Sequence, residues 1–279
     1  MTAEVVVERD LVYARLGERE SRFDLYLPRH APGPLPVVLY FHGGGWRQGS
    51  RAAGSADRLE PVARAGIAVA AVSYRFSGES LWPAQRDDAV AAVDHLRRHA
   101  ARWGLDRDRV GLWGASAGGQ IALMTSYLSV WPGDQPDNPI RSVVAWFPAT
   151  DLAAMATDTP PEGAVLPPFV DPAGPRPDFE RELVGAAPGD DATDALRAAS
   201  PLWNLGASPP PTLLIHGTHD GLISPQQSVR LYEALRERGA RCEALLVTGA
   251  THEDAAFDSP AVTGATAAWF TAMAGVRGQ

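Results

Sequence analysis

Short apolar runs alternate with helix-like stretches along most of the chain, and this alternation limits the possible folds more than any other feature. Alternating strands and helices are typical of a mainly parallel sheet with helices on both faces. Several of the runs are continuously apolar, as expected for parallel strands that are buried on both faces. We therefore predict an α/β fold with a mostly parallel eight-stranded sheet. The expected strands are Glu4–Glu8, Arg22–Leu27, Val37–Phe41, Ile67–Tyr74, Arg109–Trp113, Arg141–Phe147, Thr212–His216 and Cys242–Val247.

Proline and glycine mark several helix ends. Pro83 suits a first helical turn and Gly104 suits a C-terminal cap, which predicts a helix over Pro83–Arg102. The sequence Ser224-Pro225-Gln226-Gln227 is typical of a capping box and predicts the start of a helix that Gly239 would close. The last helix is expected over Ala261–Ala274.

One long segment, residues 152–200, has no convincing strand, and seven prolines fall within Pro160–Pro177. A loop of this length is uncommon inside a compact domain and is often a lid or a disordered insertion. We expect one domain over residues 1–279 with a small cap insertion, which contains helices near Asp178–Val184 and Asp191–Ala199. A mobile linker is the alternative.

The composition excludes several classes of protein. All 25 basic residues of the 279-residue chain are arginine, and the absence of lysine excludes lysine Schiff-base chemistry, Ser-x-x-Lys acylation and a Walker-type phosphate loop. The single Cys242 excludes an internal disulfide and a thiolate metal cluster. With no secretion signal visible at the N-terminus, we expect a cytoplasmic protein.

The charge and hydropathy pattern bears on the partners. The net charge is −8, residues 151–279 alone carry −9, and there is no basic run. Such a charge repels polyphosphates, so we expect no nucleic-acid partner. No apolar run approaches the roughly 20 residues of a membrane span, so we expect no membrane insertion.

The strongest motif is a serine among small residues, Gly114-Ala115-Ser116-Ala117-Gly118-Gly119. It directly follows the expected strand Arg109–Trp113 and precedes the apolar helix-like run Gln120–Val130. A strand-to-helix turn this tight strains its central residue, and small neighbours let the flanking backbones approach. The Ser116 hydroxyl would project at a helix N-terminus, where the dipole and free N–H groups favour negative charge. We interpret Ser116 as a nucleophile; a glycine-rich helix start without chemistry is the alternative.

A second glycine cluster, His42-Gly43-Gly44-Gly45-Trp46, follows the expected strand Val37–Phe41. Three consecutive glycines lose much backbone entropy on ordering, so their presence suggests N–H groups that closely face a ligand. The cluster can supply two such donors, and the N–H of Ala117 would be a third. A plain turn or an anion nest is the alternative, but the serine turn favours an oxyanion hole.

A serine nucleophile needs a base, and seven histidines are candidates: His30, His42, His95, His99, His216, His219 and His252. His95 and His99 lie four residues apart in an expected helix and indicate a surface or packing face. His216 ends a buried strand, which favours a structural role. His219 and His252 remain, and His252 follows the last strand at the carboxyl edge of the sheet, where catalytic groups gather in open α/β folds.

The third residue of such a site is a carboxylate that orients the base. Asp220 follows the strand Thr212–His216 and therefore lies at the same edge of the sheet. Asp254, two residues after His252, is the rival, although an i+2 neighbour need not face the histidine. Asp220 also gives the chain order serine, aspartate, histidine that α/β-hydrolases use.

At these motifs the chain resembles the α/β-hydrolase carboxylesterases with a His-Gly-Gly-Gly oxyanion motif. It is most similar to their bacterial feruloyl-esterase-like and acetyl-esterase-like branch, which is related to hormone-sensitive-lipase-like esterases and kynurenine formamidases. The motifs that carry the resemblance are Phe41–Trp46, Val72–Arg75, Trp113–Gly119, Ala199–Pro201, His216–Asp220 and Gly249–His252.

The resemblance implies an α/β-hydrolase fold and a serine hydrolase that needs no metal or organic cofactor. It implies Ser116 as nucleophile, Asp220 as acid and His252 as base. The implied oxyanion donors are the N–H groups of Gly44, Gly45 and Ala117.

Specificity is left open, because the segment Pro160–Pro177 matches nothing in this family that we can assign. We expect a small-molecule ester as the substrate and make no prediction of oligomeric state. Hydrolysis of an aryl formamide, acyl transfer, and ligand binding by an inactive hydrolase-like protein are the alternatives. Aromatic residues that could line a pocket, or could equally pack in the core, are Trp82, Trp131, Trp146, Phe147, Phe169 and Trp203.

Overall fold

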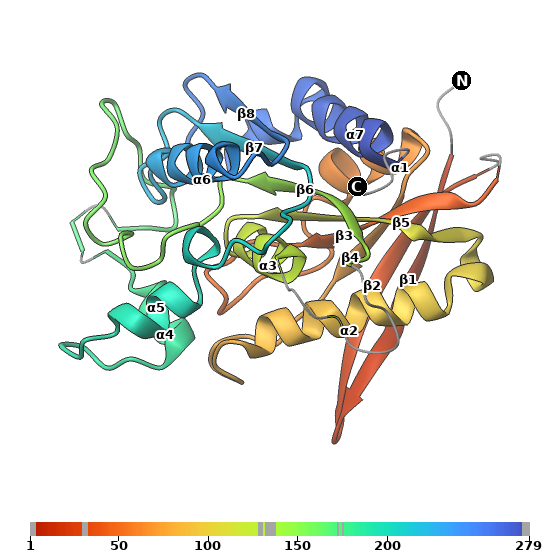
Figure 1. Ribbon diagram of the computed structural model, residues 1–279, viewed down its shortest axis with the longest axis horizontal. Coiled ribbons are helices and arrows are strands. Elements are labelled where there is room, and N and C mark those ends of the chain that lie inside the picture. The colour runs from red at the N-terminus through yellow and green to blue at the C-terminus, as the bar shows by residue number, and fades with distance from the viewer. Residues whose placement is uncertain are drawn as a thin grey trace.

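The computed structural model describes residues 4–29, 33–127, 131, 138–171, 173–174 and 176–274. Its centre is an eight-stranded sheet with the strand order β1-β2-β4-β3-β5-β6-β7-β8 (Figure 1). The strands are β1 (Val5–Leu16), β2 (Arg19–Pro28), β3 (Leu35–Phe41), β4 (Ala68–Val72), β5 (Leu105–Ala115), β6 (Ile140–Trp146), β7 (Thr212–Gly217) and β8 (Cys242–Val247). The β1–β2 and β2–β4 pairs are antiparallel, and all other pairs are parallel. The predicted sheet and its eight strands are confirmed.

Helices cover both faces of the sheet, apart from α4 (Phe179–Val184) and α5 (Thr193–Ala198), which pack on each other beside it (Figure 1). The others are α1 (Glu60–Arg64), α2 (Ala84–Arg98), α3 (Ala117–Ser126), α6 (Gln226–Glu237) and α7 (Pro260–Ala274). In β3, Val37 and Leu39 pack in the same apolar layer as α2, α3 and α6, whereas Val38 and Tyr40 pack in the layer of α1 and α7. Because successive strand residues point to opposite faces, two buried layers require the continuous apolar runs seen in the sequence.

The first strand is much longer than predicted. The expected strand Glu4–Glu8 continues to Leu16, because β1 forms a hairpin with β2. Its register shifts between Glu8 and Leu11, and Asp10 there has a φ of 58°. The Asp10 N–H donates to the buried Asp24 carboxylate at 2.8 Å. The charged residues Arg9 and Asp10, which follow the end of the predicted strand, therefore lie in a β-bulge within β1.

The predicted helix Pro83–Arg102 is interrupted. Regular helix ends at Arg98, and a 3₁₀ turn over Ala100–Trp103 leads into Gly104. The Trp103 indole N–H donates to Glu8 at 3.1 Å, and its ring packs edge-on against Phe23 at a centroid distance of 5.8 Å. Trp103 therefore packs on the sheet at the point where the helix tightens into the 3₁₀ turn. The local sequence does not encode these distant contacts.

Only the serine half of the predicted capping box forms, although the helix it predicted exists. Helix α6 begins at Gln226, whose N–H donates to Ser224 Oγ at 3.4 Å, and it ends before Gly239, as expected. Gln227 does not reach back to the helix start. Its amide oxygen instead accepts the N–H groups of Thr150 and Asp151 at 2.8 and 2.6 Å. The side chain is therefore used to hold the chain segment that follows β6.

The segment after β6 contains helices α4 and α5, close to the two positions predicted. Among its described residues, the one β-type pairing is a bridge between Val165 and Asp220. There the Val165 N–H donates to the His219 carbonyl at 2.9 Å, and the Gly221 N–H donates to the Val165 carbonyl at 3.2 Å. The segment is thus tied directly to the loop that follows β7.

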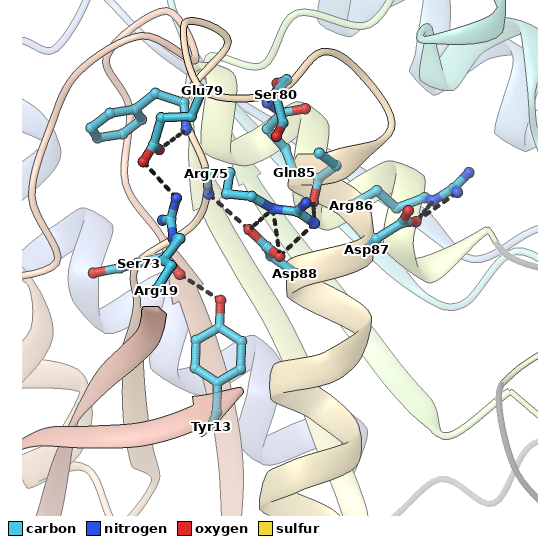
Figure 2. A network of polar contacts seen from close by, with 12 residues as sticks. Tyr13, Arg19, Ser73, Arg75, Glu79, Ser80, Gln85, Arg86, Asp87 and Asp88 are labelled. Carbon is cyan, nitrogen blue, oxygen red and sulfur yellow. Dashed lines mark hydrogen bonds and ion pairs between the residues drawn. The ribbon is translucent and has the colours of Figure 1, made fainter. Parts of the chain in front are cut away.

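A polar network holds the loop between β4 and α2 (Figure 2). Arg75 donates to the Asp88 carboxylate at the start of α2, with Nε–O distances of 3.0 Å. Glu79 accepts from the Arg19 guanidinium at 2.7 Å, and the Tyr13 hydroxyl donates to the backbone of the same loop at 2.7 Å. The network anchors both sides of the loop residue Tyr74, which contacts the glycine cluster described below.

No helix within the described ranges is long and apolar enough to cross a membrane.

Candidate active site

Ser116 occupies a sharp turn between β5 and α3, as predicted. Its φ of 54° and ψ of −120° lie outside the regions that non-glycine residues usually adopt. A side chain at Gly114 would collide with the Gly118 carbonyl, and one at Gly118 would collide with the Phe41 carbonyl. The motif needs glycine at both positions because the flanking backbones touch, and this contact leaves the Ser116 side chain at the carboxyl end of the strand.

The strain at Ser116 is balanced by hydrogen bonds. Its N–H donates to the Trp146 carbonyl of β6 at 2.9 Å, and its own carbonyl accepts the Gly119 N–H at 2.9 Å. Ala117 is the first residue of α3. Its N–H therefore belongs to the helix-start donors that have no partner within the helix.

His252 connects Ser116 to Asp220. The His252 Nε2 atom lies 2.9 Å from Ser116 Oγ, and Nδ1 lies 2.7 Å from Asp220 Oδ2. All three residues are buried, with Asp220 fully inaccessible. Because a carboxylate only accepts, the Nδ1 atom carries the proton and leaves the Nε2 lone pair facing the serine hydroxyl. The edge of the Phe147 ring packs against the imidazole at a centroid distance of 4.8 Å.

Asp220 accepts from four directions. Besides His252, its Oδ1 atom accepts the N–H groups of Leu222 and Ile223 at 3.0 and 2.9 Å. A second imidazole, His216, places Nε2 3.3 Å from Oδ2. Burial alone raises the pKa of Asp220, but the neighbouring His252 and His216 outweigh burial and hold it well below its usual range.

His216 is buried at the end of β7, as predicted, but it also contacts the candidate acid. Its Nε2 atom faces two acceptors, Asp220 Oδ2 and the Ile223 carbonyl at 3.0 Å, so this nitrogen must carry a proton. Its Nδ1 atom lies 2.7 Å from Ser228 Oγ of α6. In the sequence, His216 stands four residues before Asp220 at the end of a strand. That position indicates burial, but it does not indicate that the imidazole contacts the Asp220 carboxylate.

The rival residues lie elsewhere. His219 Nδ1 contacts the Thr218 hydroxyl at 3.0 Å, and its ring packs against Gly163 in the segment after β6. Asp254 caps the turn Ala255–Asp258, where it accepts the Ala256 N–H at 2.9 Å. It also accepts the Thr251 N–H at 3.2 Å. Asp254 therefore shapes the loop of His252 without touching the imidazole.

His95 and His99 also have other partners. His95 packs edge-on against Phe23 at a centroid distance of 5.9 Å, and its ring lies 4.6 Å from that of His99, so the predicted packing face is confirmed. His30 lies outside the described residues.

The glycine cluster after β3 curls beside the serine. Its φ angles are 121° at Gly44 and 59° at Gly45, both in the positive region that glycine tolerates. The Tyr74 hydroxyl donates to the His42 carbonyl at 2.8 Å, and the two rings stack at 4.6 Å. Burial lowers the pKa of His42. The Trp46 indole N–H donates to Gln120 of α3 at 3.0 Å and ties the far end of the loop to the serine turn.

A cavity of about 310 Å³ opens over Ser116 and His252. The glycine loop forms one wall, and the segment between β6 and β7 contributes Met155, Phe169 and Phe179. Of the aromatic residues proposed from the sequence, Phe169 lines this cavity, whereas Trp146 and Phe147 are core residues. Phe179 was not predicted; its ring covers Gly45, where an added Cβ would lie 2.9 Å from it.

An open, mostly parallel sheet with the serine turn after β5 is the α/β-hydrolase fold. The family model described as BD-FAE matches residues 23–235, and the chain belongs to this family. Carboxylesterase NlhH of Mycobacterium tuberculosis is 31% identical over 257 residues, which covers 88% of this chain and 70% of the relative. A probable isoprenylcysteine alpha-carbonyl methylesterase of Arabidopsis thaliana is 30% identical over 266 residues, or 91% of this chain. The chain spans only 52% of that plant relative's length.

Solved structures support the fold. A truncated carbohydrate esterase from gut microbiota superposes with a TM-score of 0.79 at 23% identity, covering 98% of this chain and 97% of that one. The butyrate-bound esterase Est2 of Thermogutta terrifontis gives 0.72 at 22% identity, covering 97% and 94%. Together with the family match, the relatives place this chain among the carboxylesterase-type hydrolases.

Proposed function

We propose that the protein hydrolyses small carboxylic esters through an acyl-enzyme intermediate. The observation that carries the proposal is the connected chain of Ser116, His252 and Asp220, with heavy-atom distances of 2.9 and 2.7 Å. These distances lie within hydrogen-bond reach, which a nucleophile and its general base require.

The roles follow from the proton positions. His252 Nε2 takes the proton of Ser116 Oγ as the hydroxyl attacks the ester carbonyl, and Asp220 stabilises the imidazolium that forms. The same proton passes to the leaving alcohol. A water molecule then attacks the acyl-enzyme with His252 again as base, which releases the acid and restores the serine.

The oxyanion hole is proposed from the N–H groups of Gly44, Gly45 and Ala117. Within the described chain, the N–H groups of Gly44 and Gly45 donate to no backbone carbonyl. Preorganised donors of this kind stabilise the developing negative charge at no reorganisation cost during the reaction. Gly43 packs against the Ser116 side chain, since an added Cβ would lie 3.3 Å from Ser116 Cβ.

We also propose that the insertion over residues 152–200 is a cap that selects the substrate. Phe169 supports this role, because it lines the cavity over Ser116 and yet is 58% exposed. An exposed aromatic side chain at a cavity mouth gives an apolar surface that a substrate can cover. The variant Phe169→Ala should therefore change the preference among acyl chain lengths more than the unfolding temperature.

The test combines labelling with a substrate panel. A fluorophosphonate probe should label the protein and fail to label Ser116→Ala, and acyl esters of graded chain length should be cleaved. An aryl formamide in the same panel tests amide hydrolysis, and an added alcohol acceptor tests acyl transfer. A folded protein that takes no label and cleaves none of the esters would be a ligand-binding protein, and the proposed function would be wrong.

A further inference from the structure

Three side chains with full charges line the cavity over Ser116 in the described structure: Arg58, Arg176 and Glu253. Their partners differ sharply. A paired charge contributes little net field at a bound ligand. The electrostatic character of the cavity therefore depends on which of the three charges has no partner of opposite sign.

Both cations are paired with carboxylates. Arg58 Nε and Nη2 bind Asp258 at 2.6 and 3.2 Å, and Nη1 donates to the Tyr40 hydroxyl at 2.9 Å. Arg176 binds Glu180 through two contacts of 2.6 and 3.4 Å, and the Glu180 side chain is only 1% exposed. Each guanidinium thus has its own carboxylate in a two-point contact.

Glu253 has no hydrogen-bond or ion-pair partner among the residues that the structure describes. Its backbone is in the left-handed region, with a φ of 53°, which a non-glycine residue adopts only when its surroundings impose it. Here both neighbours impose it, because His252 is held by Asp220 and Asp254 caps the following turn. The fixed backbone directs the side chain toward the glycine loop.

The carboxylate lies close to the nucleophile. A Cβ built on Gly43 would lie 3.1 Å from Glu253 Oε1 and 3.3 Å from Ser116 Cβ, so both atoms surround the same small space. A negative charge at this distance opposes the oxyanion that forms during acylation. A positive charge on the substrate would cancel this opposition and would also be attracted in the ground state.

We propose that Glu253 makes this site select esters with a cationic group on the alcohol half, such as a quaternary ammonium. The inference rests on the proposed esterase function. The alcohol half is assigned because His252, the residue adjacent to Glu253, would return its proton to the leaving alcohol. The exposed aromatic ring of Phe169 in the same cavity offers a second surface for an ammonium group.

The test compares acetylcholine with its uncharged carbon isostere, 3,3-dimethylbutyl acetate. The wild-type protein should have the higher kcat/KM for acetylcholine. Because Glu253 is exposed, its interaction with a cation is screened, and we expect the ratio of the two kcat/KM values to fall about threefold in Glu253→Gln. The same ratio should fall in the wild type as ionic strength rises. Turnover of the neutral ester should increase in the variant.

Glu237→Gln on the exposed side of α6 is the matched control, since it removes the same charge outside the cavity and should leave the ratio unchanged. A wild-type ratio below one, or equal ratios in the wild type and Glu253→Gln, would overturn the cation proposal while ester hydrolysis stands. Failure of the wild type to cleave either ester or any member of the panel would overturn the esterase function and this inference together.

Discussion

His216 offers the sharpest test of how the buried site is held together. Its imidazole is inaccessible to solvent and contacts Asp220, the Ile223 carbonyl and the Ser228 hydroxyl. The variant His216→Leu keeps a similar apolar volume but removes all three contacts. It leaves the Ile223 carbonyl and the Ser228 hydroxyl buried without a partner, at about 1–3 kcal/mol each. We expect the free energy of unfolding to fall by about 2–6 kcal/mol in a urea titration.

The same variant should move the pH–rate profile. A hydrogen bond to a charged group contributes about 1.5–3 kcal/mol, and the His216–Asp220 contact is long at 3.3 Å and shares its proton with Ile223. We therefore assign it about half of the lower value, which corresponds to about half a pH unit at 1.36 kcal/mol per unit. Without this donor the Asp220 charge is less compensated and attracts the His252 imidazolium more strongly. Only part of the contact energy reaches the imidazole, so the acid limb of kcat/KM should shift upward by at most about half a pH unit.

Two control variants separate this effect from simple destabilisation. His216→Gln keeps an N–H donor of similar reach and should restore most of the wild-type profile. Ser228→Ala removes only the contact at Nδ1, so it should lower stability without moving the acid limb. An acid limb of His216→Leu at the wild-type pH, or an equal shift in His216→Gln, would refute the reasoning.

The remaining predictions concern the proposed catalytic residues and are read from kcat on an aryl acetate. Asp220→Asn should lose about 10⁴ in turnover, because the amide presents the wrong partner to the imidazole. Asp254→Asn should keep nearly normal turnover, because its amide oxygen can still accept the Ala256 N–H that caps the turn; similar losses of turnover would mean that the acid is misassigned. His252→Ala should lose about 10⁶ and His219→Ala should remain active, and the opposite result would exchange them. Gly45→Ala should lose about 10² because an added Cβ meets the Phe179 ring at 2.9 Å and the positive φ is strained, so unchanged turnover would argue against a donor role for this loop.

The sequence determined the sheet because its signal is local. Each strand that is buried on both faces needs a continuous apolar run. The strand-to-helix turn at Ser116 needs glycines because two backbones touch there. Strand ends also placed Asp220 and His252 at one edge, since parallel strands share their carboxyl ends. The proximity of these three residues could therefore be predicted without coordinates.

Tertiary structure decided the features that depend on partners far along the chain. Arg58 binds Asp258, 200 residues away, and Gln227 holds Thr150 and Asp151 where the sequence predicted a helix cap. The pairing of each cavity cation, and hence the uncompensated charge of Glu253, follows from such contacts. Local patterns report which face of an element is buried, but the partner of a polar side chain is fixed only when the elements pack.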